Sequence, residues 1–402
     1  MKRNVLWISC HAPYDGVRHA GGQVHNYYIK KSLKANNLGI ELITFCDADQ
    51  YDDVLKDHAK YNLKSVVIPW TKSGIYERVV RKIRSINSKY NPFARYCEVT
   101  NEEYFVKILQ SIEKLSCKKP DIVILQWTQI GLFASRLKKI FPEAKFILIE
   151  EDVVYLSYYR KKNAQSGIKK VIADYKYQKI KRLELESLKC ADLVILNNPK
   201  DECLVKSGGI ERTWRWTPYF NNMLDLQREK TSKDIVFFGA MSRPENHDSV
   251  MWFINNVFNK IKDENIRFVV VGNKPKKELI DTTSKRIIVT GFVESVRPYF
   301  QKSLCCVAPL VMGAGVKIKV LESLSAGIPV LTNDIGIEGI PASDGKEYIH
   351  CNTPEDYVNA IERLIANPEY GIELGEHAKE FIRKNYDYKK DADAFISKLE
   401  KM

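Results

Sequence analysis

Short runs of hydrophobic residues alternate along the chain with longer segments in which apolar positions repeat at a helical spacing. The runs have the length of buried strands, and the segments between them have the length of amphipathic helices. This alternation predicts an α/β fold with parallel sheets, because a helix must return the chain to the same edge before the next parallel strand starts.

A second series of hydrophobic runs begins near residue 235 and repeats the pattern of the first half. Residues 216–233 lie between the two series and are turn-like, then polar, as expected of a linker. We therefore predict two similar α/β domains, an N-terminal one at 1–225 and a C-terminal one at 226–402. The predicted strands are residues 5–9, 41–45, 65–68, 121–126, 145–150, 192–197, 235–239, 267–272, 286–290, 304–308, 329–332 and 347–350. The clearest predicted helices are residues 22–36, 102–115, a long helix ending near 189, 248–262, 316–325 and 389–401.

The composition is that of a soluble globular protein, with 402 residues, 45% hydrophobic and 28% charged. No apolar run approaches the roughly 20 residues that a membrane-spanning helix needs. The nine cysteines form no CxxC pair, so we expect neither a zinc site nor a disulfide framework. The apolar run at the start is too short for a signal peptide and fits a first strand. These features predict a cytoplasmic protein.

The formal net charge of +13 is concentrated in two basic clusters of the N-terminal half. These clusters fit solvated helix faces, attraction to an anionic membrane surface, or contact with nucleic acid. No DNA- or RNA-binding motif accompanies them, so nucleic acid is the least expected partner. The first cluster is Arg78, Arg81, Lys82 and Arg84, and the second is Arg160, Lys161, Lys162, Lys169, Lys170, Lys176, Lys179, Lys181 and Arg182.

The segment 311–330 carries the densest chemical signal of the chain. Gly313 and Gly315 form a loop that a ligand can approach closely, and a helix is predicted to follow directly. Free N–H groups at a helix start attract phosphate, and Lys317 and Lys319 add positive charge there. Glu322 lies more than a turn further along, where its carboxylate could accept hydrogen bonds from sugar hydroxyls. A plain turn explains the glycines equally well.

Further polar residues follow other predicted strands, at the edge where open parallel sheets bind their ligands. Gly21 and Gly22 open the first predicted helix, either as a diphosphate contact or as a helix start that needs small residues. Three adjacent carboxylates, at 150–152, end another strand, and they are either solvated or hold substrate hydroxyls. Arg243 follows the first strand of the second half and suits a phosphate, which guanidinium binds with two parallel hydrogen bonds.

The segment 311–330, together with the sequence Gly-Phe-Val-Glu-Ser-Val-Arg-Pro-Tyr-Phe at 291–300, resembles the retaining glycosyltransferases of family 4. The resemblance is firm from about residue 235 to 340 and faint before that. It implies the GT-B fold, in which two Rossmann-like domains face a central cleft and the last helix packs on the N-terminal domain. In that family the glutamate matching Glu322 binds the ribose of the nucleotide. The family often has a second glutamate where this chain has Ala314, and the Gly-Ala-Gly-Val-Lys form resembles a subgroup that lacks it.

The resemblance also assigns roles to residues of both halves. It implies that basic residues hold the diphosphate and that Asp152 and Glu151 lie on the acceptor side, with Glu151 standing where the family often has histidine. The expected catalytic residues are Glu151, Asp152, Arg243 and Lys317. The expected donor-binding residues are Gly21, Gly22, Gly239, Arg243, Asn273, Phe292, Val293, Gly313, Ala314, Gly315, Lys317, Lys319 and Glu322.

The predicted function is therefore retaining transfer of a sugar, of hexosyl type, from a nucleoside-diphosphate sugar to a hydroxyl acceptor. The resemblance implies glycan or lipid-linked acceptors, as in cell-surface polysaccharide or glycoconjugate synthesis, and hence an enzyme on the inner face of the membrane. No cofactor is expected, and no Asp-x-Asp motif is placed for a metal. A Rossmann oxidoreductase is disfavoured, because loop 10–22 lacks the Gly-x-Gly-x-x-Gly spacing. An inactive GT-B-like binding protein with a basic N-terminal half stays open.

Overall fold

The computed structural model describes residues 2–402 except 18–19, 70–101, 117, 230–232 and 314. The chain forms two compact units, Met1–Tyr219 with Tyr388–Met402, and Phe220–Asp387. The sequence placed a single boundary near residue 225, whereas the structure divides the chain at Tyr219 and again at Asp387. The second division arises because the last helix, α16 (Tyr388–Lys401), packs with the first unit. The basic cluster from Arg78 to Arg84 lies outside the described residues.

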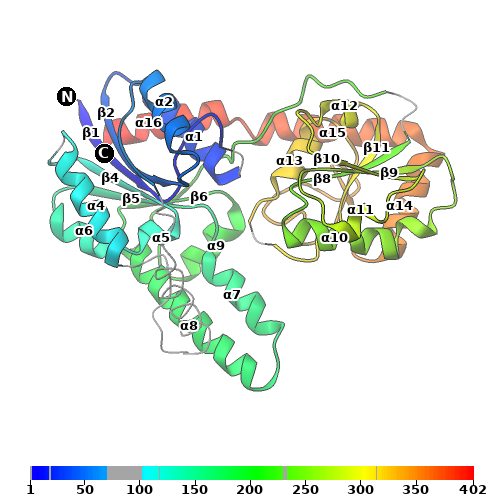
Figure 1. The fold of residues 1–402 in the computed structure, drawn as a ribbon, viewed down its shortest axis with the longest axis horizontal. Coiled ribbons are helices and arrows are strands. Elements are labelled where there is room, and N and C mark those ends of the chain that lie inside the picture. Colours follow the sequence, from blue (N-terminus) through cyan, green and yellow to red (C-terminus); the bar gives the residue numbers. More distant parts are fainter. Residues whose placement is uncertain (1, 18–19, 70–101, 117, 230–232, 314) are drawn as a thin grey trace. The chain divides into compact units, whose positions relative to one another are not determined.

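The first unit is built on a parallel seven-stranded sheet with the order β3-β2-β1-β4-β5-β6-β7 (Figure 1). The register is fixed at the centre, where Val5 of β1 pairs with Ile40 on one side and Ile122 on the other. The strands are β1 (Arg3–Ser9), β2 (Leu38–Cys46), β3 (Lys64–Pro69), β4 (Ile122–Gln126), β5 (Lys145–Glu150), β6 (Leu193–Leu196) and β7 (Thr213–Arg215).

Alternate side chains of these strands pack into two separate cores, which explains why the strands read as unbroken hydrophobic runs. Val5 and Trp7 of β1 face one core, which includes α1 (Ala20–Ser32) and α16. Leu6 and Ile8 face the opposite core, which includes α4 (Glu102–Lys114). The other helices of the unit are α2 (Tyr51–Lys60), α5 (Thr128–Gly131), α6 (Ala134–Ile140), α7 (Val154–Asn163), α8 (Gly167–Lys189) and α9 (Pro199–Ser207).

The second unit repeats this architecture with a parallel six-stranded sheet of order β10-β9-β8-β11-β12-β13. Figure 1 shows α10 and α14 on one face of this sheet and α12 and α15 on the other. Its strands are β8 (Asp234–Phe238), β9 (Arg267–Val271), β10 (Ile287–Gly291), β11 (Ser303–Ala308), β12 (Val330–Thr332) and β13 (Ile349–His350). Its α-helices are α10 (Pro244–Asn256), α11 (Lys277–Ile280), α12 (Arg297–Gln301), α13 (Ile318–Ser325), α14 (Pro354–Ala366) and α15 (Pro368–Asn385).

The predicted α/β organisation is confirmed, and the differences lie at element ends. Helix α10 begins at Pro244 rather than residue 248, because proline suits the first helical position even though the apolar periodicity starts later. Helix α1 begins at Ala20 rather than at residue 22, so Gly21 and Gly22 both lie inside its first turn. The short edge strand β7 was missed, since three residues carry no readable period. Nowhere in the described ranges is there a helix long and apolar enough to span a membrane.

Candidate functional site

The loops at the carboxyl ends of β8 and β9 approach each other so closely that only glycine fits. A Cβ on Gly272 would lie 1.7 Å from the carbonyl oxygen of Gly239, and a Cβ on Gly239 would lie 2.8 Å from Nδ2 of Asn246. Gly239 has φ +153° and Gly272 has φ +156°, backbone conformations that residues other than glycine rarely adopt. The predicted donor residue Gly239 is thus required by the packing of this edge, whatever binds there.

Lys319, in the first turn of α13, joins the starts of two helices. Its Nζ donates a hydrogen bond of 2.6 Å to Oδ1 of Asn246 in α10. The amide of Asn246 in turn donates to the carbonyl of Ala240 at 2.9 Å, which fixes its orientation. The ammonium also lies 4.1 Å from the ring centroid of Phe237, at cation–π distance. Lys319 is therefore the best-held cation of this edge, although the sequence marked Lys317 more strongly.

Burial lowers the pKa of Lys319 to about 7, and the positive charges of Arg243 and Lys317 act in the same direction. Desolvation disfavours the charged amine, and neighbouring cations repel the added proton. The negative charge of an anion placed here would oppose both effects and raise the pKa of Lys319. The arrangement thus favours a strongly anionic ligand such as a phosphate.

The other two predicted phosphate contacts are held differently. Arg243 precedes α10, is largely exposed, and pairs with Glu245 at 2.6 Å between Nε and Oε1. Such exposed pairs contribute little stability, so the guanidinium can exchange partners at little cost. Lys317 precedes α13, and its Nζ donates to the carbonyl of Gly315 at 2.5 Å, within its own loop. Its methylene chain also lies against Gly313, where an added Cβ would come within 3.2 Å.

Glu322 lies on the second turn of α13 and is buried, with 8% of its surface exposed. Its Oε1 accepts a hydrogen bond of 3.2 Å from the backbone N–H of Asn221. Burial raises the pKa of Glu322 to about 7, while the hydrogen bonds from Asn221 and the charge of Lys319 oppose the shift. Glu322 therefore anchors the start of the second unit, in addition to any ligand role.

The remaining predicted donor residues of this unit follow β9 and β10. Asn273 accepts a hydrogen bond from Met241 N–H at its carbonyl (3.0 Å), and its buried side-chain Oδ1 has no partner among the described residues. Phe292 is 63% exposed, whereas Val293 packs against the apolar cluster below it. Ala314 lies outside the described residues. The structure thus buries the side-chain oxygen of Asn273 and leaves the Phe292 ring largely exposed.

The first unit holds a separate polar network around Glu151, at the end of β5. Oε1 of Glu151 accepts from the amide of Gln126 at 2.8 Å, and Oε2 accepts from the amide of Asn197 at 2.8 Å. The side-chain oxygen of Gln126 accepts a hydrogen bond of 2.9 Å from the indole N–H of Trp7. The side-chain oxygen of Asn197 accepts one of 2.5 Å from the indole N–H of Trp216. Because an indole can only donate, both amides are forced to present N–H groups to Glu151.

Burial raises the pKa of Glu151 to about 7, against the lowering effect of these two amides. A carboxyl group with this pKa exchanges a proton near neutral pH, as a general base requires. An added Cβ on Gly21 would lie 3.6 Å from the Glu151 carboxyl carbon, so the first turn of α1 meets this carboxyl group. The structure thus brings together Gly21 and Glu151, which are far apart in the sequence.

The three adjacent carboxylates at 150–152 have three different environments. The buried Glu150 accepts from the hydroxyl of Thr128, and burial together with the charge of Glu184 raises its pKa. Asp152 is exposed. Glu184 of α8 accepts from the backbone N–H groups of Val154 and Tyr155, at 2.8 and 2.9 Å, and so caps the start of α7. Of the three, only Glu151 combines a raised pKa with a position beside Gly21, in the first turn of α1.

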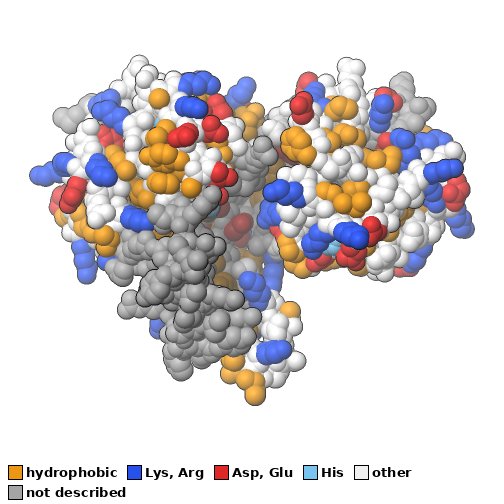
Figure 2. Space-filling model, in the orientation of Figure 1, with side chains coloured by type: hydrophobic (Ala, Val, Ile, Leu, Met, Phe, Trp, Pro, Cys, Tyr) orange, Lys and Arg blue, Asp and Glu red, His pale blue; other side chains and the backbone are white. Residues whose placement is uncertain are grey.

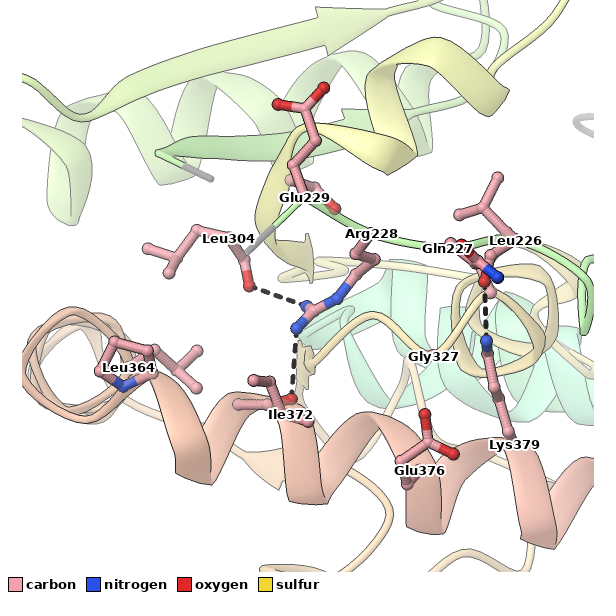
Figure 3. A pocket seen from close by; sticks show the side chains of 14 residues that line it. Leu226, Gln227, Arg228, Glu229, Leu304, Gly327, Leu364, Ile372, Glu376 and Lys379 are labelled. Carbon is pink, nitrogen blue, oxygen red and sulfur yellow. Dashed lines mark hydrogen bonds between the residues drawn. The ribbon is translucent and has the colours of Figure 1, made fainter. Parts of the chain in front are cut away.

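A cavity of about 250 Å³ lies in the second unit, away from the carboxyl edge (Figure 3). Its lining includes the start of β11 and the residues that follow α13, so it lies at the amino-terminal edge of the sheet, opposite the edge that carries Lys319. The guanidinium of Arg228 donates to the carbonyls of Leu304 and Gly371, both at 3.4 Å, and Lys379 donates to the carbonyl of Leu226 at 2.7 Å. These bonds tie the segment after residue 224 to the sheet and α15, which gives the cavity a structural explanation.

Some of the residues that organise both sites were missed from the sequence: Asn246, Gln126, Asn197, Trp7 and Trp216. A signal existed for Gln126, because it is the polar last residue of an otherwise apolar strand. Asn197 likewise follows the apolar β6 directly. The sequence around Trp7 and Trp216 did not indicate this role, because their indole N–H groups find hydrogen-bond partners only in the folded core.

Comparison with known proteins agrees with this architecture. Solved structures that superpose on the whole chain include sucrose-phosphate synthase of Thermosynechococcus elongatus, with TM-score 0.68, 12% identity and coverage of 100% of this chain and 99% of that one. HepE of Anabaena in complex with UDP has TM-score 0.67 and 11% identity, with 100% of each chain covered. The chain has a GT-B fold.

Sequence comparison finds a family match within the second unit. Residues 232–367 match the family model described as Glycosyl transferases group 1. A curated protein of Klebsiella pneumoniae, described as an uncharacterized 44.6 kDa protein in the cps region, is 26% identical over 206 residues. That match spans 48% of this chain and 52% of the relative, about half of each. The family model and the GT-B fold together support a glycosyltransferase.

Proposed function

We propose that this protein is a retaining glycosyltransferase that uses a nucleoside-diphosphate sugar as donor and a glycan or lipid-linked hydroxyl as acceptor. The observation that carries the proposal is the Lys319–Asn246 hydrogen bond, which holds a partly buried amine between the starts of α10 and α13. The diphosphate would lie against Lys319, Arg243 and the N–H groups of these helix starts. The HepE structures, solved with UDP and with UDP-glucose, support this class of donor.

The chemistry follows from where negative charge develops. As the glycosidic bond to the diphosphate breaks, charge grows on the leaving phosphate, and preorganised cations stabilise it most in a water-poor site. Lys319, Arg243 and Lys317 would provide this stabilisation without a bound metal. Glu322 would accept hydrogen bonds from the ribose hydroxyls. Glu151 and Asp152 would bind the acceptor hydroxyl, and its proton would pass to Glu151 or to the leaving phosphate.

The pathway is proposed from two observations. The curated relative is described as lying in a cps region, and the resemblance implies acceptors of polysaccharide or glycoconjugate synthesis. We accordingly place the reaction on the cytoplasmic side of a membrane, in the building of a cell-surface glycan.

The first experiment is a thermal-shift screen with UDP-, GDP-, ADP- and dTDP-sugars, followed by measurement of nucleoside-diphosphate release. One donor should raise the melting temperature and release its nucleotide, with EDTA leaving the rate unchanged. Glu322→Gln keeps the bond to Asn221 but loses the negative charge, so donor affinity should fall about tenfold. The exposed Glu373→Gln should change nothing. The anomeric configuration of the product, read by NMR, tests retention.

Two outcomes would contradict the proposal. Inversion at the anomeric carbon would remove the retaining mechanism. Donor binding without hydrolysis or transfer to any hydroxyl acceptor would favour a GT-B-like binding protein.

A further inference from the structure

Helices α7 and α8 form a hairpin that extends away from the sheet of the first unit (Figure 1). Helix α8 has 23 residues and is therefore about 35 Å long. The two helices are joined by aromatic packing, with ring centroids of Tyr159 and Tyr177 5.5 Å apart. An ion pair of 2.6 Å between Lys162 and Asp174 ties them further along. The hairpin is thus an ordered element with a free end.

The free end exposes hydrophobic side chains that nothing in the described chain covers. Ile168 is 81% exposed and Val171 is 69% exposed, more than any other large hydrophobic side chain that the structure describes. They stand three residues apart in the first turns of α8, and therefore on one face of the helix. Exposed aliphatic side chains gathered on one face of a helix offer an apolar surface to a binding partner.

Basic residues surround this apolar end. Residues 154–182 contain nine Lys or Arg and one acid, Asp174, which is already paired. Lys169 and Lys170 lie in the first turn of α8, which has no acidic residue. Cations at a helix start are unfavourable, because the helix dipole is positive there. Figure 2 shows hydrophobic side chains at this end of the molecule with Lys or Arg side chains beside them. The sequence therefore keeps positive charge where helix stability alone disfavours it.

We propose that the tip of the α7–α8 hairpin docks on an anionic lipid bilayer, with Ile168 and Val171 inserted at the interface and Lys169 and Lys170 on the lipid phosphates. Aliphatic side chains flanked by lysines match the boundary between acyl chains and negative headgroups. Nucleic acid fits the tip less well, because interfaces with nucleic acid are polar, whereas Ile168 and Val171 are aliphatic. This docking does not depend on the proposed transfer reaction.

Docking would also place the proposed acceptor side near the lipid. Helix α7 begins at Val154, two residues after Asp152, so the hairpin follows directly on the segment that carries the proposed acceptor contacts. This consequence, unlike the docking itself, rests on the proposed function.

The test is co-sedimentation of the full chain with vesicles of phosphatidylcholine alone and of phosphatidylcholine with phosphatidylglycerol in equal parts. The protein should bind the anionic vesicles and not the neutral ones. Ile168→Ser/Val171→Ser and Lys169→Gln/Lys170→Gln should each lower the partition coefficient by about tenfold or more. Added salt should weaken binding of the serine variant further and should weaken binding of the glutamine variant less, because that variant has lost two of the basic residues.

Matched controls lie elsewhere on the surface. Val106→Ser, at another exposed hydrophobic, and Lys276→Gln/Lys277→Gln, at another exposed lysine pair, should bind as the unmodified protein does. Equal binding to both vesicle types, or unchanged binding by both hairpin variants, would overturn the proposal. So would a concentration-dependent dimer that the serine variant abolishes, or equal affinity for a duplex oligonucleotide. Nucleotide binding is measured in parallel, so that a failure of docking is distinguished from a failure of the proposed function.

Discussion

The Nζ of Lys319 lies 2.6 Å from Oδ1 of Asn246, so one hydrogen bond joins the first turns of α13 and α10. The two residues are 73 positions apart in the chain, and their helices follow different strands of the same sheet. The bond holds an amine with a lowered pKa at the edge where parallel sheets bind their ligands.

Removing the Lys319 charge should abolish most donor use. Lys319→Met keeps the length and apolar packing of the side chain but removes the ammonium, and we expect kcat/KM to fall roughly 100-fold or more. Lys317→Met should cost less, because that amine is bonded within its own loop. The exposed Lys285→Met is the control and should be neutral. A larger loss from Lys317→Met than from Lys319→Met would contradict the assignment of Lys319 as the principal cation.

Nucleoside-diphosphate binding should take up a proton near neutral pH. In the free protein the pKa of Lys319 is about 7, so the amine is largely uncharged above that pH. A bound diphosphate raises this pKa, so affinity should fall as pH rises above 7, by up to about tenfold per unit. Titration calorimetry in two buffers of different ionisation enthalpy measures the proton directly. Lys319→Met should bind with no such uptake.

Glu151→Gln should destabilise the first unit even though the two side chains have the same shape. The introduced amide places an N–H₂ group against the amide of Gln126 or Asn197, and neither can turn because Trp7 and Trp216 fix them. An unsatisfied buried donor costs about 1–3 kcal/mol, which urea unfolding should detect.

A second substitution should repair that loss. In Glu151→Gln/Gln126→Glu the new carboxylate accepts from both the Trp7 indole and the introduced amide, so every hydrogen bond is restored. Stability should recover while transfer does not, because the carboxyl group has left its place beside Gly21. Recovery of both would show that Glu151 serves structure alone.

Two glycine substitutions should act in opposite directions. Gly272→Ala puts a Cβ 1.7 Å from the Gly239 carbonyl oxygen and should destabilise the second unit by several kcal/mol. Gly21→Ala meets Glu151 and Trp127 only at ordinary contact distances in a helix turn, and should be neutral or stabilising by up to about 1 kcal/mol. Calorimetric melting temperatures compare the two.

The glycines, lysines and glutamate at 313–322 predicted a loop and helix start after a strand, because loop glycines and helix starts have local signatures, and the structure places them at the carboxyl edge of the second sheet. This pattern could not rank Lys317 against Lys319. That ranking depends on Asn246 and Phe237, which approach Lys319 only when β8 and β11 pair in the sheet. The residue types alone likewise did not distinguish the three carboxylates at 150–152. The family resemblance singled out Glu151 and Asp152, and burial then separated Glu151 from the exposed Asp152.

The amino-acid sequence by itself determined the α/β alternation, the two units and the strand edge at which polar residues gather. These features follow from local periodicity and from residues that terminate strands and start helices. The family resemblance implied that the last helix packs on the N-terminal domain, and the structure groups α16 with the first unit. Only the tertiary structure decided that Trp7 and Trp216 orient the amides around Glu151 and that Ile168 and Val171 stay exposed. Each of these features depends on which segments, distant in the sequence, pack together and exclude water. Local sequence patterns do not specify those long-range contacts.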